Sequence, residues 1–249
     1  MSDESKPEIE DERHRWLLEQ YTEIASLAGG LAHEIRNPLS TLSLNLQLLA
    51  EDFQNPQSQV ERRALQKIET LQRECRRLEE ILSDFLRFAR VSDLTVAPAD
   101  INALLQEMID FHAPKAQAMQ VLVRHDLPPA IPQVQLDIDL FKQAFLNLFL
   151  NALQAMPNGG EMIVRTRCDG KNVLINVIDT GPGMSRETMA KIFKPFFSTR
   201  PSGSGLGLPT TKKIIEAHQG KLLVDSEPGK GTAFTIVLPV ATAKPAPAA

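Results

Sequence analysis

The sequence lacks a run of apolar residues that could cross a membrane. A membrane-spanning helix needs about 20 consecutive apolar residues, and no stretch of the 249 residues approaches this. The first 15 residues are acidic and polar, whereas a secretory signal has a basic segment followed by an apolar one. These absences predict a cytoplasmic chain with no transmembrane segment. A piece cut from a membrane receptor would have the same features.

Cysteine and excess positive charge are also missing. The two cysteines, Cys75 and Cys168, have no neighbours at the spacing of metal ligands, so we expect both to be buried as small hydrophobic side chains. The formal net charge is -4. An acidic chain is poorly suited to nucleic acid, because binding there depends on basic side chains that displace counterions from the phosphates. Nucleic acid is therefore not an expected partner.

The remaining composition is that of a globular protein. Hydrophobic residues make up 43% of the chain and charged residues 23%, which is enough apolar material to bury a core. The polar ends at 1–14 and 241–249 are expected to be disordered. Between them the hydrophobic pattern changes once, which predicts one domain at 15–92, a linker at 93–97 and a second domain at 98–240.

The first domain has the pattern of two long helices. Apolar residues recur every three or four positions from Trp16 to Phe53, and an irregular step at Pro38 predicts a kink or local unwinding. A turn is expected at 55–58, and a regular heptad pattern follows from Ala64 to Ala89. The apolar stripe is wider than one hairpin can bury, so we expect two hairpins to form a four-helix bundle in a homodimer.

The second domain alternates helices and strands. Helices are expected at 101–112, 138–156 and 185–192 and up to about 218, with strands near 121–125, 162–167, 173–178, 221–226 and 233–238. This order predicts a mixed sheet covered on one face by helices. The fold class is therefore α+β multidomain, with a helical hairpin followed by an α/β sandwich.

His33 lies in the segment His33-Glu34-Ile35-Arg36-Asn37-Pro38-Leu39 of the first predicted helix. At roughly 100° per residue it is about 200° around the helix from Leu31 of the apolar stripe, so it faces solvent. The ordinary interpretation is a surface histidine without a role. Here, however, Glu34 can hold the proton on Nδ1 and leave Nε2 to attack, and Asn37 can orient a water molecule from the same face.

Two motifs of the second domain suggest a ligand. Asn147 and Asn151 lie four residues apart on one face of an apolar helix, and such amides either cross-link the core or face a hydrated Mg²⁺ with phosphates. Asp179 ends a predicted strand and is followed by Gly181 and Gly183. Its carboxylate can accept the exocyclic amine of adenine while the glycines let the base approach, although Asp-x-Gly-x-Gly is also a competent turn.

A third motif, Gly203-Ser204-Gly205-Leu206-Gly207, opens the next predicted helix. Backbone N–H groups at a glycine-rich helix start bind phosphate through unpaired donors and the helix dipole. The spacing is not that of a Rossmann or P-loop motif. A flexible loop with one glycine cap does not explain a glycine at every second position, so phosphate binding is favoured.

Together these motifs resemble those of sensor histidine kinases. The segment from His33 to Leu39 is similar to the phospho-acceptor box, and the three later motifs, in order and spacing, resemble the N, G1 and G2 boxes of the kinase ATP-binding domain. The segment 192–200 resembles the F box between them. The resemblance covers residues from about 20 to 238. It implies that His33 is phosphorylated, that Glu34 is the general base, and that Asn37 supports dephosphorylation of the partner protein.

The same resemblance assigns the nucleotide site, with ATP and Mg²⁺ as cofactors. Asn151 is the expected Mg²⁺ ligand with Asn147 nearby, and Arg200 is placed to reach the γ-phosphate. Adenine is expected at Asp179, Gly181 and Gly183, and the phosphates at Gly203, Gly205, Leu206 and Gly207.

Related ATPases of the gyrase, mismatch-repair and chaperone type place a glutamate four residues before the Mg²⁺ asparagine to activate water, and here that residue is Asn147. Transfer to a protein side chain is therefore favoured over hydrolysis, with a separate response regulator as the partner and possible phosphatase activity toward it. The alternatives are a nucleotide-binding scaffold without catalysis and a chaperone-like ATPase.

Overall fold

The computed structural model describes residues 34–89, 94–200 and 203–241. These residues form two compact units, one made of 34–89 with 199–200 and 203–204, the other of 94–198 with 205–241. Each unit is described by itself below. The ends that we expected to be disordered lie outside the described residues, apart from Ala241.

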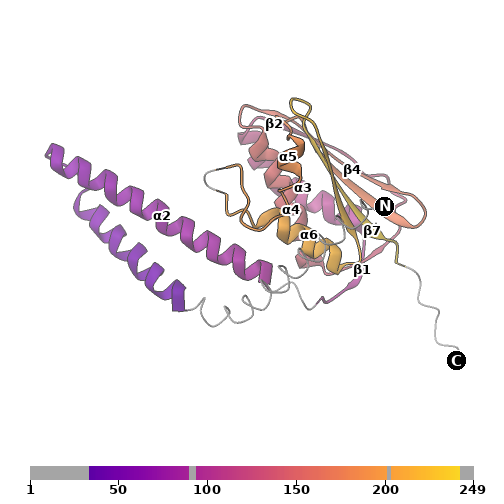
Figure 1. The fold of residues 1–249 in the computed structure, drawn as a ribbon, viewed down its shortest axis with the longest axis horizontal. Helices are drawn as coiled ribbons and strands as arrows, with labels where there is room; N and C mark the ends of the chain where they lie inside the picture. Colours follow the sequence, from indigo (N-terminus) through magenta and orange to yellow (C-terminus); the bar gives the residue numbers. More distant parts are fainter. Residues whose placement is uncertain (1–33, 90–93, 201–202, 242–249) are drawn as a thin grey trace, which may run out of the picture. The chain divides into compact units, whose positions relative to one another are not determined.

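The first unit contains a helical hairpin (Figure 1). The chain is helical at 34–52, and helix α2 spans Gln59–Ala89. The first helix is continuous through Pro38, so the local unwinding expected there is absent. Proline removes one hydrogen bond from a helix, and burial of the next side chain, Leu39, favours the helical conformation in spite of this loss. Among the helices of the described residues, none is long and apolar enough to cross a membrane.

A reciprocal cap fixes the start of α2. The hydroxyl of Ser58 accepts the N–H of Glu61 at 3.2 Å, and the Glu61 carboxylate accepts the N–H groups of Gln57 and Ser58 at 2.6 and 3.4 Å. These bonds satisfy donors that have no partner inside the helix. The predicted turn at 55–58 is thus confirmed, and α2 begins at Gln59, five residues before the heptad pattern that was expected from Ala64.

The apolar stripe of the hairpin divides into a buried and an exposed set. Leu39, Ile68 and Cys75 are at most 8% exposed. Four leucines of the predicted stripe remain between 45% and 53% exposed, namely Leu42, Leu49, Leu71 and Leu78. Each exposed pair is seven residues apart along its helix, so one hairpin leaves an apolar stripe uncovered.

A five-stranded sheet forms the second unit. Its strand order is β2-β4-β5-β7-β6, with bounds Val121–Asp126 (β2), Gly160–Cys168 (β4), Asn172–Asp179 (β5), Thr232–Pro239 (β7) and Lys221–Ser226 (β6). Strand β2 runs parallel to β4 and the other neighbours are antiparallel. The prediction of a mixed sheet is confirmed.

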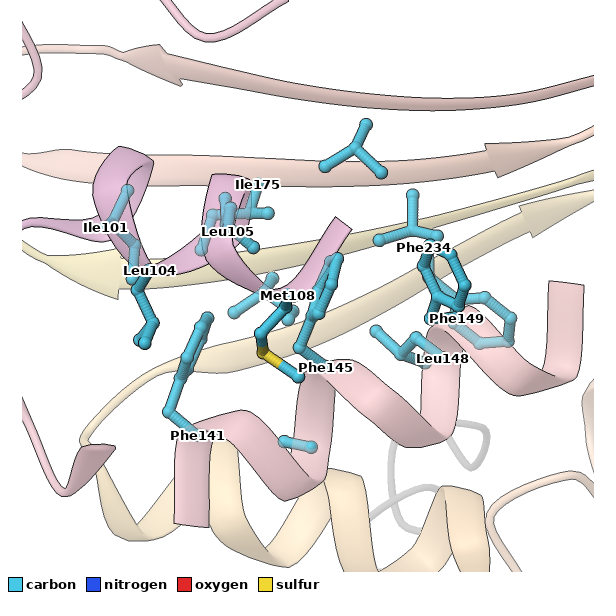
Figure 2. Packing of buried hydrophobic residues seen from close by; sticks show 14 of the residues in the cluster. Ile101, Leu104, Leu105, Met108, Phe141, Phe145, Leu148, Phe149, Ile175 and Phe234 are labelled. Atoms are coloured by element: carbon cyan, nitrogen blue, oxygen red, sulfur yellow. The ribbon is translucent and has the colours of Figure 1, made fainter. Parts of the chain in front are cut away.

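Helices cover one face of this sheet (Figure 1). They are α3 (Ile101–Ala118), α4 (Ile138–Ala155), the short α5 (Arg186–Met189) and α6 (Gly207–Ala217). Helix α4 packs against α3, α6 and β5. Every second residue of β5 is buried, as expected for a sheet with one covered face. Figure 2 shows Phe141, Phe145 and Phe149 pointing from α4 into the buried cluster that also contains Met108 of α3 and Ile175 of the sheet.

Two short strands were missed by the sequence analysis. Strand β1 (Ala97–Ala99) pairs antiparallel with β3 (Val134–Leu136), so the last residue of the predicted linker is already in a strand. Prolines in and around both segments obscured them, because proline is depleted in strands. Helix α3 also extends past its expected end and contains Pro114.

The two cysteines differ in burial. Cys75 is buried in the hairpin as expected, whereas Cys168 is exposed, which corrects the prediction. Cys168 is the last residue of β4 and pairs there with β5, but it lies three residues beyond the last pair that β4 forms with β2.

Candidate functional site

Helix α4 carries the two asparagines on one half-buried face. Asp137 caps the start of the helix by accepting the N–H of Leu140 at 3.1 Å. The Nδ2 group of Asn147 donates to the carbonyl of Gly207 at 3.1 Å and to the hydroxyl of Thr211 at 3.3 Å. Asn147 therefore cross-links α4 to α6, one of the two roles that the sequence left open. Its amide hydrogens serve this link, so a ligand would meet its carbonyl oxygen.

Asp179 ends β5 with its carboxylate almost fully buried. The side chain belongs to a residue that is 5% exposed, and its Oδ1 accepts the N–H of Gly181 at 2.9 Å. A Cβ on Gly181 would lie 2.8 Å from that same oxygen and 2.9 Å from the Cβ of Ala155. Glycine is required at 181 because any side chain would displace the carboxylate.

Gly183 brings the loop after Asp179 against the turn between β6 and β7. Its φ of +67° favours glycine, and a Cβ would lie 1.9 Å from the carbonyl oxygen of Glu227. The N–H of Gly229 in the same turn donates to the carbonyl of Pro182 at 2.7 Å. The turn therefore holds the loop after Asp179 in place.

Sequence reasoning missed the contribution of this turn. Gly231 follows the turn with a φ of +84° and packs directly on the backbone of Asp179. Thr232 is the partner of Asp179 in the β5–β7 ladder. The only sequence signal was a glycine pair around Lys230 between two predicted strands, which indicates a turn but not its contact.

The start of α6 has features expected of a phosphate site. The residues before α3, α4 and α5 cap their helices with a side chain, whereas the residue in that position before α6 is Leu206, which has no polar side chain to do so. Gly205 has a φ of +69°, and a Cβ there would lie 2.5 Å from the backbone of Phe196. Leu206 is buried, so only its backbone can meet a ligand. A Cβ on Gly207 would make ordinary contacts within the protein at 3.8 Å, so the protein itself does not require glycine there.

The remaining predicted residues lie elsewhere. Arg200 and Gly203 are grouped with the hairpin unit, where the N–H of Gly203 donates to the carbonyl of Arg200 at 3.2 Å. Glu34 and Asn37 are exposed on the helix at 34–52. His33 is outside the described residues, so its exposure stays a prediction.

Comparison with known proteins identifies both parts of the chain. Residues 24–93 match the His Kinase A (phospho-acceptor) domain, and residues 136–242 match the histidine kinase-, DNA gyrase B- and HSP90-like ATPase family. The two matches follow each other along one chain, as in a two-component histidine kinase. The chain belongs to this family of histidine kinases.

Known histidine kinases are similar over most of this chain. Sporulation kinase E of Bacillus subtilis (strain 168) is 35% identical over 87% of the chain, but the chain spans only 29% of that relative's length. A crystal structure of full-length ShkA in complex with AMPPNP has a TM-score of 0.70 and 28% identity, covering 88% of this chain and 46% of ShkA. The crystal structure of the histidine kinase ThkA in complex with the response regulator TrrA has a TM-score of 0.64 and 25% identity. The match covers 96% of this chain and 68% of the matched chain.

Proposed function

We propose that this histidine kinase uses ATP to phosphorylate its own His33 and then passes the phosphoryl group to an aspartate of a separate response regulator. The observation that carries the proposal is the nucleotide-type site of the second unit. There the buried carboxylate of Asp179, the asparagines of α4 and the glycine-rich start of α6 occur together. The phospho-acceptor match at 24–93 includes His33. We propose that it acts in the cytoplasm, where ATP is supplied.

In this proposal each part of the site binds one part of MgATP. Asp179 accepts the adenine amine, and the backbone N–H groups at the start of α6 hold the phosphates. Asn151, with the carbonyl oxygen of Asn147, faces the Mg²⁺. The fit is chemical: Mg²⁺ takes oxygen ligands, keeps several waters and is often completed by phosphates. The described residues contain no cluster of three histidine, cysteine or acidic side chains that would form a protein-only metal site. Bound Mg²⁺ neutralises phosphate charge.

In the proposed transfer step, the two ring nitrogens of His33 have different roles. Nε2 of His33 attacks the γ-phosphorus in line, so that an N–P bond forms as the bond to the β–γ bridging oxygen breaks and ADP leaves. Glu34 accepts the proton from Nδ1, which the attack makes acidic. In the second step, an aspartate of the regulator attacks the phosphorus and the histidine leaves. Arg200 is proposed to meet the γ-phosphate and Gly203 to line the phosphates.

The exposed stripe of the hairpin supports a homodimer. Four half-exposed leucines at heptad spacing leave an apolar surface that a second hairpin would cover in a four-helix bundle. We therefore propose a division into a dimerisation and phosphotransfer domain at 15–92 and an ATP-binding domain at 98–240.

Incubation with γ-labelled ATP and Mg²⁺ tests the function. We expect label that is acid-labile and alkali-stable, the behaviour of a phosphoramidate, and its loss in His33→Gln while nucleotide affinity is kept. Label in the His33→Gln variant would contradict the assignment. Nucleotide binding without phosphoprotein would instead favour a scaffold, and sustained ATP turnover without phosphoprotein a chaperone-like ATPase.

A further inference from the structure

Helices α4 and α6 are tied to each other at two places. At one, Nδ2 of Asn147 donates to the carbonyl of Gly207, the first residue of α6. At the other, the backbone N–H of Asp137, just before α4, donates to Nε2 of His218, just after α6, at 2.9 Å. The helices are therefore antiparallel. About ten residues separate the two ties on each helix, or roughly 15 Å at 1.5 Å per residue.

His218 is a buried histidine that the kinase reaction does not use. It is 5% exposed, and its Nδ1 lies 2.7 Å from the carbonyl of Ile214. A carbonyl only accepts, so Nδ1 carries the hydrogen and Nε2 is the acceptor for Asp137. Both ring nitrogens are thus paired in the neutral form, and the ring joins the end of α6 to the start of α4.

Asp137 provides a fixed point for this bond. Its Oδ1 accepts the N–H of Leu140 in the first turn of α4, and its Oδ2 accepts the N–H of Thr95 at 3.0 Å. The neighbouring residue Leu136 is paired with Ala97 in the β1–β3 ladder. Three contacts that do not involve His218 therefore fix the backbone position of Asp137.

We propose that His218 is a positioning residue for the phosphate end of the nucleotide site. A hydrogen-bonded helix is stiff along its axis, so a tie at the end of α6 sets how far its start extends along α4. That position fixes the N–H groups at Gly207 relative to Asn147 and Asn151. The inference rests on the proposed ATP-binding function and adds to it a residue remote from the ligand.

Two substitutions separate the two bonds of the ring. His218→Gln can place its amide oxygen near the position of Nε2 and keep an acceptor for Asp137. His218→Asn can keep a donor to Ile214 but is too short to reach Asp137. We expect His218→Asn to weaken ATP binding by roughly three- to tenfold, the effect of one lost buried hydrogen bond, with adenosine affinity within about twofold of wild type. His218→Gln should bind both ligands nearly as wild type does.

The ratio of ATP to adenosine affinity is the decisive measurement, because general loosening of the fold would weaken both ligands together. The same titrations are made with His125→Asn, an exposed histidine on β2, as the control. Equal losses for ATP and adenosine, or a His218→Gln variant as weak as His218→Asn, would overturn the proposal. Failure of the wild-type protein to bind ATP would contradict the proposed function itself, whereas normal binding in His218→Asn contradicts only the role of His218.

A measurement on the wild-type protein covers the case in which His218→Asn does not fold. Coupling between two sites is reciprocal, so phosphate binding must also stabilise the Asp137–His218 bond. Hydrogen exchange of the Asp137 amide should slow more with ATP than with adenosine, relative to the amide of Leu104, which donates to Asp100 at the start of α3. Equal slowing by the two ligands would rule out the positioning role of His218.

Discussion

Gly231 lies so close to Asp179 that no side chain fits between their backbones: a Cβ on Gly231 would be 1.9 Å from the carbonyl oxygen of Asp179. A Cβ on Gly183 would likewise be 1.9 Å from the carbonyl oxygen of Glu227. The loop after β5 and the turn between β6 and β7 are therefore locked together by two glycines. The buried carboxylate proposed to bind adenine depends on this contact for its place.

The first prediction compares two glycines of this turn. Gly229 and Gly231 have similar φ values of +80° and +84°, but a Cβ on Gly229 would meet nothing within 4 Å. Alanine at either position is strained by about 1–2 kcal/mol, and only alanine at 231 also pushes on Asp179. We expect Gly231→Ala to weaken ATP binding at least tenfold and Gly229→Ala to leave it nearly unchanged. Calorimetric titration and thermal unfolding of both variants check this.

Asp179→Asn provides the reference for that comparison. It removes a charged acceptor for the adenine amine, which should cost about 1–3 kcal/mol of binding energy. If Gly231→Ala and Gly229→Ala lower ATP affinity equally, backbone strain alone explains the loss, and the contact with Asp179 does not matter.

The second prediction concerns stability and pH at Asp137. Burial raises the pKa of this carboxyl group, but hydrogen bonds from the backbone N–H groups of Thr95 and Leu140 outweigh it, so that the pKa lies below its usual value. A depressed folded-state pKa stabilises the fold above the unfolded-state value and loses this effect as the pH falls. Asp137→Asn should therefore cost about 1 kcal/mol near neutral pH, with the difference shrinking below about pH 4.

The control for Asp137→Asn is the matching substitution at the cap of α3. Asp100 accepts the N–H groups of Asn102 and Ala103 through one oxygen, Oδ1. Asparagine keeps such an acceptor and is itself a good cap, so Asp100→Asn should change stability little. Urea unfolding at several pH values measures both variants. A loss for Asp137→Asn that persists unchanged at low pH would show that the charge is not the cause.

The third prediction tests the exposed stripe of the hairpin. Leu71 and Leu78 are 53% and 50% exposed, so their replacement disturbs the hairpin itself little. Burying a leucine contributes up to about 1.5–3 kcal/mol, and glutamate at both positions places charge in the proposed dimer core. We expect the double variant Leu71→Glu, Leu78→Glu to be monomeric in sedimentation equilibrium at concentrations where the wild type is dimeric. Val60→Glu, at a residue that is 76% exposed near the hairpin turn, serves as the control.

Periodicity in the sequence predicted the elements with long, regular patterns. Helix α4 was expected at 138–156 and spans Ile138–Ala155, and β5 was expected one residue short at each end. Such elements bury one face, so their pattern directly records the core. The exposure of Cys168 was not predictable in this way, because the alternation within β4 does not say where the neighbouring strand β2 ends.

Contacts between segments far apart in the sequence were not predictable. The motif around Asp179 could be recognised, but not its support by Gly231, because a glycine turn between two strands has the same local signal wherever it packs. His218 was noted only as the end of a helix, and its bond to Asp137 depends on the antiparallel packing of α4 and α6. The reactive histidine was predicted from its neighbours in sequence, and that prediction stays open because His33 is outside the described residues.

The last prediction concerns Asn37, which is exposed on the helix at 34–52. Its neutral amide has no acid–base capacity, but it can orient a water molecule for attack on the phospho-aspartate of the regulator. This water is not needed when His33 attacks ATP. We therefore expect Asn37→Ala to reduce dephosphorylation of the regulator far more than autophosphorylation.

The competing explanation is that Asn37 supports the helix next to Pro38. The carbonyl of Asn37 accepts a hydrogen bond from the hydroxyl of Thr41 at 3.0 Å, and alanine at 37 retains this bond. The substitution should therefore leave the helix intact. Asn45→Ala, in which an exposed asparagine of the same helix loses its bond to the carbonyl of Thr41, controls for loss of an amide. Both rates are measured for both variants together with thermal unfolding. A proportional loss of the two activities in Asn37→Ala, accompanied by a lower melting temperature, would exclude the water-positioning role.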